Sequence, residues 1–580
     1  MRRLPPLAIA LGALGLAIAY ALVTARLAGR LALPADDAYA YLTCATQRAC
    51  AGSPSASWPA LLAIPGAVVQ GHGLVVVAFW IGALLYAITA ATAFVLARRL
   101  GGALAGVLAA VATLAIAPLA WASLAGLEVA LVTACWLSAL ALFDGRADAD
   151  RPGAALTIVL IALGLAHRDA IVVVAAIALV GAWGTTSWRG LVCWIVPVLP
   201  ALAWVAISQT RARDHMIDLE ALRGDGAPLA YAFAVLWVIG AVRLARRRSA
   251  LALLVVLTPI AVLLVGGRAA AFPAFAVVVG SAASTLDLAP RARLAGALVA
   301  ILLLGGLAVL PLRASLLQYA QDASDLDRRV APFTPRFADA TSIATHDPGA
   351  VGYYSGRAIA LDGSDPLEGP GARYERLERL APGPSHFLSS PTALGFDVLF
   401  GEVRAVGRAG PRLAPRAWTR GEVHWIEADW DRATAGERPL APHPGWRVVD
   451  RIDLADLADE AAHHWRAATS GKQATLLHRE TAGPIVDGGR TITSGEQFVI
   501  ESDPARPVRL LLRTGGHRQY PDHEAVAGAT LQLAGRSVTI PPPRGPLVEL
   551  ELELPAGQRE ITVVTDRPYR AFHWFVLQRD

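Results

Sequence analysis

The sequence predicts a multi-pass α-helical membrane bundle of about eleven spans, followed by an external α/β region and an antiparallel β-sandwich. Hydrophobic residues make up 54% of the 580 residues and charged residues 17%, which excludes an ordinary soluble protein. Long apolar runs alternate with short polar loops up to about residue 312. Beyond about residue 480, short runs of alternating polar and apolar residues are separated by glycine and proline turns, as in a sandwich.

The predicted spans follow from length, because a helix needs roughly 20 apolar residues to cross a bilayer. The first run follows Arg2 and Arg3, as in a secretory signal, but we expect it to be retained because its removal would break the alternation of loops. The runs that qualify lie near residues 5–25, 74–97, 102–118, 125–143, 154–167, 170–187, 190–208, 229–245, 249–266, 270–286 and 294–312.

Arginine positions predict the orientation, since cytoplasmic loops carry an excess of basic residues. This places the amino terminus in the cytoplasm and the chain after residue 312 outside the cytoplasmic membrane. The net charge of +5 comes mainly from these arginines, which would face anionic lipid, so it does not indicate nucleic-acid binding. The clusters that fall on one predicted side are Arg2-Arg3, Arg98-Arg99, Arg146 with Arg151, Arg189, Arg246-Arg247-Arg248 and Arg291 with Arg293.

An acidic pair, Asp36 and Asp37, follows the first predicted span on the external side. Beside a bilayer each carboxylate loses hydration and repels the other, so the pair suggests proton transfer or cation binding. Cys44 and Cys50 follow in the same loop, in a compartment where disulfides persist, and we expect them to form a disulfide; two unpaired thiols are the alternative. Residues 57–69 are too short to span and are typical of an interfacial helix.

Three local segments resemble the GT-C superfamily of membrane glycosyltransferases. Pro34-Ala-Asp-Asp-Ala-Tyr-Ala-Tyr-Leu42 is similar to its Asp-Asp-Ala-Tyr-Ile segment, and Leu124-Ala-Gly-Leu-Glu-Val-Ala-Leu131 resembles its Gly-Met-Glu-Thr-Ala-Leu segment. Gly164-Leu-Ala-His-Arg-Asp169 is similar to its Gly-Leu-Ala-Leu-Thr-Arg-Pro-Glu segment. The chain departs from the family where His167 replaces the threonine and Asp169 the proline, and in a shorter loop after Cys50.

This resemblance implies transfer of a sugar from a polyprenyl-phosphate donor to a hydroxyl of a glycan, lipid or protein acceptor of the cell envelope, outside the cytoplasmic membrane. Asp36 or Asp37, with a pKa raised by its partner and the apolar surroundings, would act as the base. Arg168 would stabilise the departing lipid phosphate. Glu128 would hydrogen-bond the sugar or share a divalent cation with the acidic pair.

His167, Asp169 and Tyr39 complete the expected substrate site, and no cofactor is assigned. Structural roles are the alternatives. The acidic pair would cap a helix, Arg168 would anchor a lipid headgroup, and Glu128 would be a buried hydrogen-bonding group.

The chain after the membrane domain, predicted as residues 1–312, divides into an α/β domain at 313–480 and a β-sandwich at 481–580. Residues 341–363 predict strand, glycine turn, helix and strand, and further helices are expected at 371–381 and 453–468. In the sandwich, carbohydrate binding would require exposed aromatic and polar side chains, although these residues could equally be core or loop residues. The candidates are Tyr520, His523, Tyr569, His573 and Trp574.

Two rival functions remain at this point. One is a transporter or flippase for a lipid-linked or anionic substrate, and the other is a non-catalytic membrane receptor or assembly protein. A transporter should carry ionisable residues near the middle of several spans, whereas here the charged candidates collect at the predicted outer ends, which favours the enzyme.

Overall fold

The structure is a computed structural model, and its two parts are described separately. By internal contacts, one unit comprises Met1–Asp327 with Gly352–Tyr354, and the other comprises Arg328–Val351 with Ser355–Asp580. The residues described are 6–47, 55–144, 151–183, 185, 187–207, 251, 254–256, 258, 290–361, 373, 376–377, 379–380, 383–389, 394, 400–408, 422–428, 430, 438–468, 477–482, 485–515, 528–541 and 547–579.

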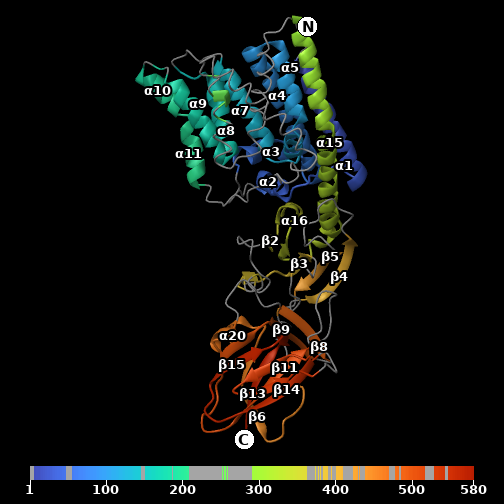
Figure 1. Ribbon diagram of the computed structural model, residues 1–580, viewed down its shortest axis with the longest axis vertical. Helices are drawn as coiled ribbons and strands as arrows, with labels where there is room; N and C mark the ends of the chain where they lie inside the picture. The colour runs from blue at the N-terminus through green and yellow to red at the C-terminus, as the bar shows by residue number, and fades with distance from the viewer. Residues whose placement is uncertain are drawn as a thin grey trace. The chain divides into compact units, whose positions relative to one another are not determined.

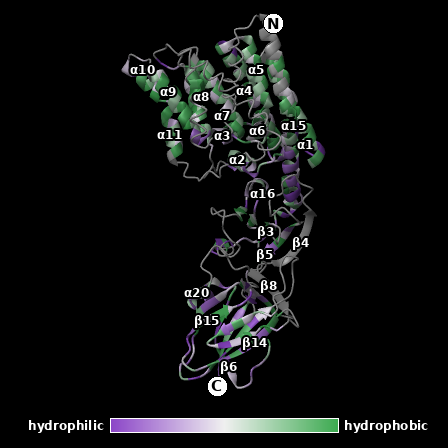
Figure 2. Cartoon of the chain, in the orientation of Figure 1, coloured by the Kyte–Doolittle hydropathy of each residue, from purple (hydrophilic) through white to green (hydrophobic). Residues whose placement is uncertain are grey.

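The first unit is built from apolar helices, as predicted for a membrane protein (Figures 1 and 2). Among the described residues, 3 helices are long and apolar enough to cross a membrane, or up to 4 if a pair bent by 65° is one span. The predicted count of about eleven is not confirmed, because spans 229–245 and 270–286 lie outside the described residues. The helices are α1 (Pro6–Ala28), α4 (His72–Gly101), α5 (Ala103–Ala115), α6 (Ala117–Leu124), α7 (Val129–Asp144), α8 (Ala154–Ala166), α9 (Ile171–Trp183), α10 (Trp188–Ile195), α11 (Val198–Ile207) and α15 (Pro290–Val330).

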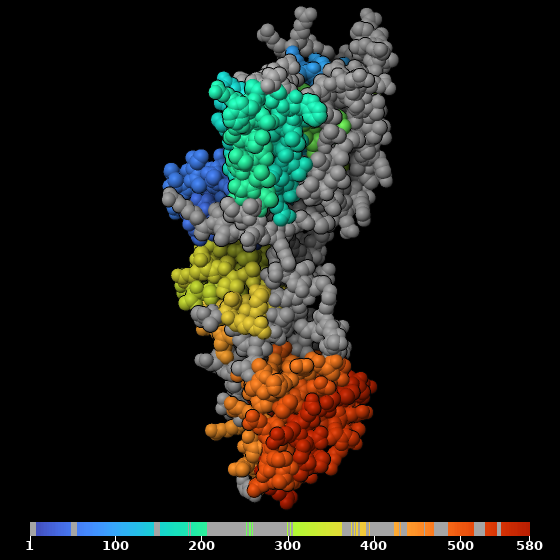
Figure 3. Space-filling view, turned by 90° about the vertical axis from the view of Figure 1, so that its left-hand side faces the viewer, coloured from blue at the N-terminus to red at the C-terminus, as the bar shows by residue number. Residues whose placement is uncertain are grey.

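Helix α4 is the centre of this unit and packs against α1, α5, α6 and α7 (Figure 1). Its Gly82 lets the backbone of α6 approach closely, since a Cβ there would lie 2.2 Å from the Ser123 carbonyl oxygen. The phenol of Tyr20 on α1 donates to Ser315 Oγ on α15 at 2.9 Å. Helices α8 to α11 form one continuous surface in Figure 3 (teal).

Two shorter helices follow α1. Helix α2 spans Asp36–Gln47, and α3 spans Ser57–Gly66 within the segment expected to be an interfacial helix. Each is too short to cross a bilayer. They pack against each other, and α3 also contacts α8.

The second unit begins with a mixed sheet in the order β2-β1-β3-β5-β4. Strand β1 (Ile343–Thr345), helix α16 (Pro348–Ser355) and parallel strand β2 (Ala358–Ala360) agree with the strand, helix and strand predicted over 341–363. The predicted glycine turn is wrong, because Gly349 and Gly352 lie within α16. The remaining strands are β3 (His386–Ser389), β4 (Phe400–Arg408) and β5 (Glu422–Ala428). The helix predicted over 453–468 is wrong in extent, because Asp453 ends a strand and α20 covers only Leu457–Ala462.

The carboxyl-terminal region is rich in antiparallel β-structure, as predicted. Its sheets have the orders β13-β12-β15-β10-β7, β14-β11-β17-β6 and β16-β9-β8. Alternate residues of the first two sheets meet in one buried cluster that includes Leu510, Phe498 and Trp574. The strands are β6 (Trp446–Asp453), β7 (Arg466–Ala467), β8 (Leu477–Ala482), β9 (Ile485–Ile492), β10 (Gly495–Val499), β11 (Val508–Gly515), β12 (Thr530–Leu533), β13 (Arg536–Thr539), β14 (Leu547–Leu554), β15 (Glu560–Thr565), β16 (Tyr569–Ala571) and β17 (His573–Arg579).

The aromatic side chains considered for carbohydrate binding do not form an exposed surface. Tyr569, His573 and Trp574 are each 0% exposed, so a stacking role for them is wrong. Tyr520 and His523 lie outside the described residues.

A buried carboxylate organises this core. Glu496 accepts hydrogen bonds from Trp465 Nε1 at 2.6 Å, from Trp574 Nε1 at 2.9 Å and from the phenol of Tyr569. Burial raises the pKa of Glu496, and these three donors act in the opposite direction. One carboxylate therefore satisfies three aromatic donors that would otherwise be buried without an acceptor.

Replacing this carboxylate should destabilise the second unit. Glu496→Leu leaves three buried donors without an acceptor, and we expect it to lower the free energy of unfolding by about 3 kcal/mol. Hydrogen exchange of β10 and β17 during chemical denaturation measures this loss within the second unit. The exposed Glu501→Leu is the control, and equal stability of the two variants would contradict the role of Glu496.

Candidate functional site

The acidic pair forms the first turn of α2. Carboxylates are favoured there because the positive end of the helix dipole faces them. Both Asp36 and Asp37 are half-buried. Tyr39 is buried; its phenol oxygen accepts the Leu33 backbone N–H at 3.4 Å, and its ring lies 6.0 Å from that of Tyr354. The described contacts of Tyr39 are therefore with the backbone and with aromatic rings.

Glu128 stands in the turn between α6 and α7, where its carbonyl oxygen accepts the first hydrogen bond of α7 from Val132 N at 2.9 Å. The turn depends on Gly126, which has φ of 78°. A Cβ at Gly126 would lie 2.7 Å from Leu33 Cδ1 and 3.2 Å from Ala38 Cβ. This glycine therefore lets the Glu128 turn approach the start of α2.

His167, Arg168 and Asp169 form the turn that ends α8. The backbone of His167 is extended, and Asp169 N donates to His167 Nδ1 at 3.3 Å. A ring nitrogen that accepts a hydrogen bond carries no proton, so the proton of the neutral ring is on Nε2. Nε2 lies 3.8 Å from Glu128 Oε1, and Arg168 Nε lies 3.5 Å from Asp169 Oδ1.

The first turn of α3 holds these two turns together. Trp58 Nε1 donates to the Gly126 carbonyl oxygen at 2.8 Å, and Trp58 itself is fully buried. Ser57 Oγ donates to Ala162 O at 3.2 Å, and Ala56 N donates to Leu165 O at 2.9 Å. One short helix thus fixes the Glu128 turn and the end of α8 relative to each other.

Tyr41 joins the acidic pair to Glu128 and was not among the predicted site residues. It is 2% exposed. Burial raises the pKa of the Tyr41 phenol well above its usual value, and the nearby charges of Glu128 and then Asp37 raise it further. The i, i+4 spacing from Asp37 was the available signal, since it puts both residues on one face of α2.

The three segments singled out by their sequence thus meet in one cluster. Tyr41 interacts electrostatically with Asp37 and Glu128. His167 in turn lies near the carboxylates of Glu128 and Asp169. Arg168 borders the cluster and is 34% exposed. Cys44 lies in α2, but Cys50 lies outside the described residues, so the disulfide stays a prediction.

Comparison with known proteins gives a structural likeness only. No family model matches the sequence, and no curated protein matches it. Similar solved structures include ArnT from Cupriavidus metallidurans, with 17% identity, coverage of 70% of this chain and 96% of that chain, and a TM-score of 0.44. The oligosaccharyltransferase from Archaeoglobus fulgidus has 11% identity, coverage of 96% and 95%, and a TM-score of 0.44. Arabinofuranosyltransferase AftD from Mycobacteria has 13% identity, coverage of 98% and 61%, and a TM-score of 0.42.

These similar structures are GT-C glycosyltransferases.

Replacing Gly126 should displace the Glu128 turn. Gly126→Ala places a Cβ on a left-handed backbone and in close contact with Leu33. We expect it to lower the free energy of unfolding by about 1–3 kcal/mol. Gly15→Ala in α1 is the matched control, because a Cβ there meets nothing within 4 Å. Thermal unfolding of both variants in lipid distinguishes them, and an unchanged transition for Gly126→Ala would be evidence against this packing.

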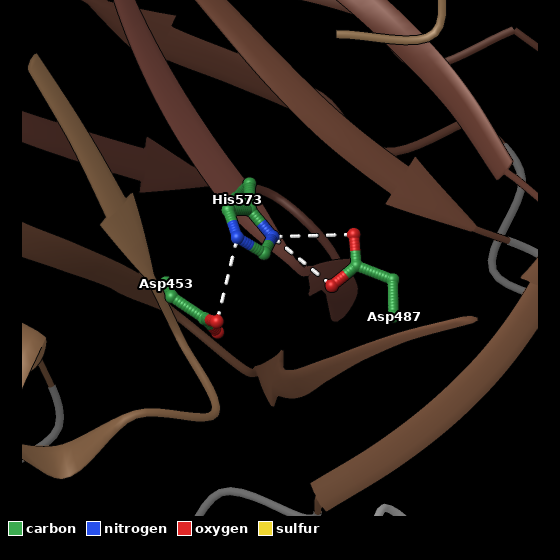
Figure 4. Close-up of side chains that lie close together, drawn as sticks. All are labelled: Asp453, Asp487 and His573. Atoms are coloured by element: carbon green, nitrogen blue, oxygen red, sulfur yellow. Dashed lines mark hydrogen bonds and ion pairs between the residues drawn. The ribbon is translucent and has the colours of Figure 1, made fainter. Parts of the chain in front are cut away.

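A second group of ionisable side chains lies in the second unit (Figure 4). His573 Nδ1 is 3.0 Å from Asp487 Oδ1, and His573 Nε2 is 3.4 Å from Asp453 Oδ2. Asp487 also pairs with Arg513 Nη1 at 2.6 Å. The two carboxylates and the imidazole are close enough to one another to hold a metal ion. However, the imidazole stands between the two carboxylates, so its two nitrogens face different partners, as in a buried ion network.

The charges of this network respond to burial and to one another. Burial raises the pKa of Asp453 to about 7, with His573 acting in the opposite direction. Burial would lower the pKa of His573, but Asp487 and Asp453 raise it above the usual value. Both folded-state pKa values are therefore raised, so both groups favour folding most in their protonated forms.

The stability of the second unit should consequently fall as pH rises. The contribution of Asp453 is complete below about pH 4 and is lost as pH rises through 7, and the contribution of His573 is lost above its ordinary pKa of about 6.5. We expect a loss of roughly 1–3 kcal/mol between pH 5 and pH 8. Hydrogen exchange of β11 and β17 in the full chain measures it.

Asp453→Asn should reduce this pH dependence, because the amide imitates the protonated acid and retains an acceptor for Ala455 N. Glu560→Gln, at an exposed position, should leave the dependence unchanged. A pH profile that is identical in wild type and Asp453→Asn would exclude this group as the cause.

Proposed function

We propose that the chain is an integral-membrane glycosyltransferase that moves a sugar from a polyprenyl-phosphate donor to a hydroxyl of a cell-envelope acceptor on the external face of the cytoplasmic membrane. The single observation that supports it is the convergence of Asp37, Tyr41, Glu128 and His167 from three distant segments of the sequence. These segments are the ones that resemble the motifs of one transferase superfamily. On this proposal the second unit is an external accessory region.

The chemistry requires a base for the acceptor. The acceptor oxygen attacks the anomeric carbon and forms the new C–O bond, while the bond from that carbon to the phosphate oxygen breaks and polyprenyl phosphate leaves. The acceptor proton passes to Asp36 or Asp37. A half-buried carboxylate in the first turn of α2 suits this step, because it lies beside the cluster and can take the proton of a hydroxyl bound there.

The leaving group requires a cation. Negative charge collects on the lipid phosphate as its bond to the sugar breaks, and a fixed positive charge stabilises that state more than the ground state. Arg168 is our candidate, because its guanidinium is partly exposed and is held beside Asp169 at the border of the cluster. Glu128 would bind the sugar between the base and this cation, with His167 positioned beside its carboxylate.

Removing the base should abolish transfer. We expect Asp36→Asn or Asp37→Asn to lower kcat by at least about 100-fold, because one of them takes the acceptor proton. The assay uses the full chain in lipid with polyprenyl-phosphate donors carrying arabinofuranose, mannose or an aminosugar, together with glycan acceptors. Thr46→Ala is the control, since the Thr46 hydroxyl donates only to carbonyls of its own helix.

The outcomes separate the rival functions. Product that depends on donor and is lost in one aspartate variant supports the transferase and identifies its base. Full turnover in both variants contradicts the proposed mechanism. Donor binding without turnover in the wild type would instead favour a transporter or flippase, and absence of donor binding would favour a receptor or assembly protein.

A further inference from the structure

Two buried polar atoms in the cluster have no hydrogen-bond partner among the described residues. They are the phenol oxygen of Tyr41 and Oε2 of Glu128, on side chains of residues that are 2% and 3% exposed. A buried polar group left without a partner costs about 1–3 kcal/mol. Other buried polar atoms of the described residues also lack a partner, but these two are neighbours inside the candidate site, which points to a ligand that bonds both.

The two groups are neighbours. The Glu128 carboxylate raises the pKa of the Tyr41 phenol through its charge and as a hydrogen-bonding neighbour, yet neither the phenol oxygen nor Oε2 completes a hydrogen bond of standard geometry. The other carboxylate oxygen, Oε1, faces His167 Nε2 at 3.8 Å, which is also too long for a direct hydrogen bond. Tyr41 therefore offers a donor, and Glu128 offers an acceptor, to the same neighbourhood.

We propose that Tyr41 and Glu128 form a hydroxyl-binding subsite for the ring of the transferred sugar and so determine which sugar is accepted. A sugar hydroxyl can donate to the Glu128 carboxylate while it, or its neighbour on the ring, accepts from the Tyr41 phenol. This inference rests on the proposed transferase function. Its place beside Asp37, one helical turn earlier on α2, would orient the anomeric carbon toward the base.

A hydroxyl fits this pair better than a metal ion does. Burial keeps the Tyr41 phenol protonated, and a protonated phenol donates a hydrogen bond but is a poor metal ligand. The proton on His167 Nε2 also faces Glu128, so that nitrogen has no lone pair for a cation at the carboxylate. His167 is thus a positioning residue that directs Oε1 toward itself and leaves Oε2 for the ligand.

The test compares sugars that differ by one hydroxyl. Wild type, Tyr41→Phe and Glu128→Gln are assayed as full chains in lipid nanodiscs with the three polyprenyl-phosphate sugars and their monodeoxy analogues. For the preferred sugar we expect kcat/KM to fall about 10-fold in Tyr41→Phe and about 10- to 100-fold in Glu128→Gln. For one monodeoxy analogue, wild type and Tyr41→Phe should differ by less than about twofold, because the bond is already missing.

Matched controls keep structural effects apart from binding. Tyr86→Phe removes a phenol on α4 that bonds the Leu114 carbonyl outside the cluster, and it should leave the sugar preference unchanged. Thermal unfolding in the same nanodiscs shows whether each variant is folded, and Glu128→Gln provides a second reading if Tyr41→Phe is unstable.

Several outcomes would overturn the subsite. An equal loss of activity in Tyr41→Phe on every deoxy analogue would show a structural role only. Full activity of Tyr41→Phe, in an assay in which Asp37→Asn is inactive, would show that the phenol does not bind the sugar. Glu128 would instead be a metal ligand if a chelator abolished activity, a divalent cation restored it, and kcat/KM were the same for the sugar and its monodeoxy analogues. If no donor turns over, donor binding by the same variants decides the subsite, while the transferase proposal fails separately.

Discussion

The hydrogen bond from Trp58 to the Gly126 carbonyl is the constraint on which the candidate site depends. The indole is fully buried, so its N–H must find a partner, and the left-handed glycine supplies a carbonyl where no other residue could approach so closely. The same turn of α3 also bonds the end of α8. The uncharged hydrogen bond between Trp58 and Gly126 thus fixes the position of the Glu128 turn. The charged side chains of the cluster both attract and repel one another, so their own interactions would not set this spacing.

The sequence was informative where short-range chemistry decides the structure. The positions of α1 and α4 and the β1–α16–β2 unit agree with expectation, because apolar length and turn residues act locally. The acidic pair lies in the first turn of a helix, which had been only the alternative interpretation. The three site segments were found from sequence, and their resemblance to one superfamily led us to expect them in one site. The contacts that hold them together were not expected, because they depend on Trp58 and Gly126, which carry no chemical role of their own.

Tyr41 and the aromatic strand β17 were misjudged for a physical reason. Tyr41 lies in a motif in which the acidic residues draw attention, and only its burial reveals its position between Asp37 and Glu128. On β17, alternation should expose every second residue, yet Trp574 faces one core and Phe575 packs with Leu511 in another. Both faces of that sheet are covered, so a period of two no longer distinguishes inside from outside.

The strand order also determines when this region can fold during synthesis. Strand β6 precedes the other strands of this region in the sequence, but its partner in the sheet is β17, which is made after them. Asp453 at the end of β6 and Asp487 in β9 receive their imidazole partner only with that final strand. Until then Asp453 has no imidazole partner and Asp487 has only Arg513, and burial of these charges without His573 disfavours premature closure of the core. The ionic network thus makes assembly of this region depend on β17.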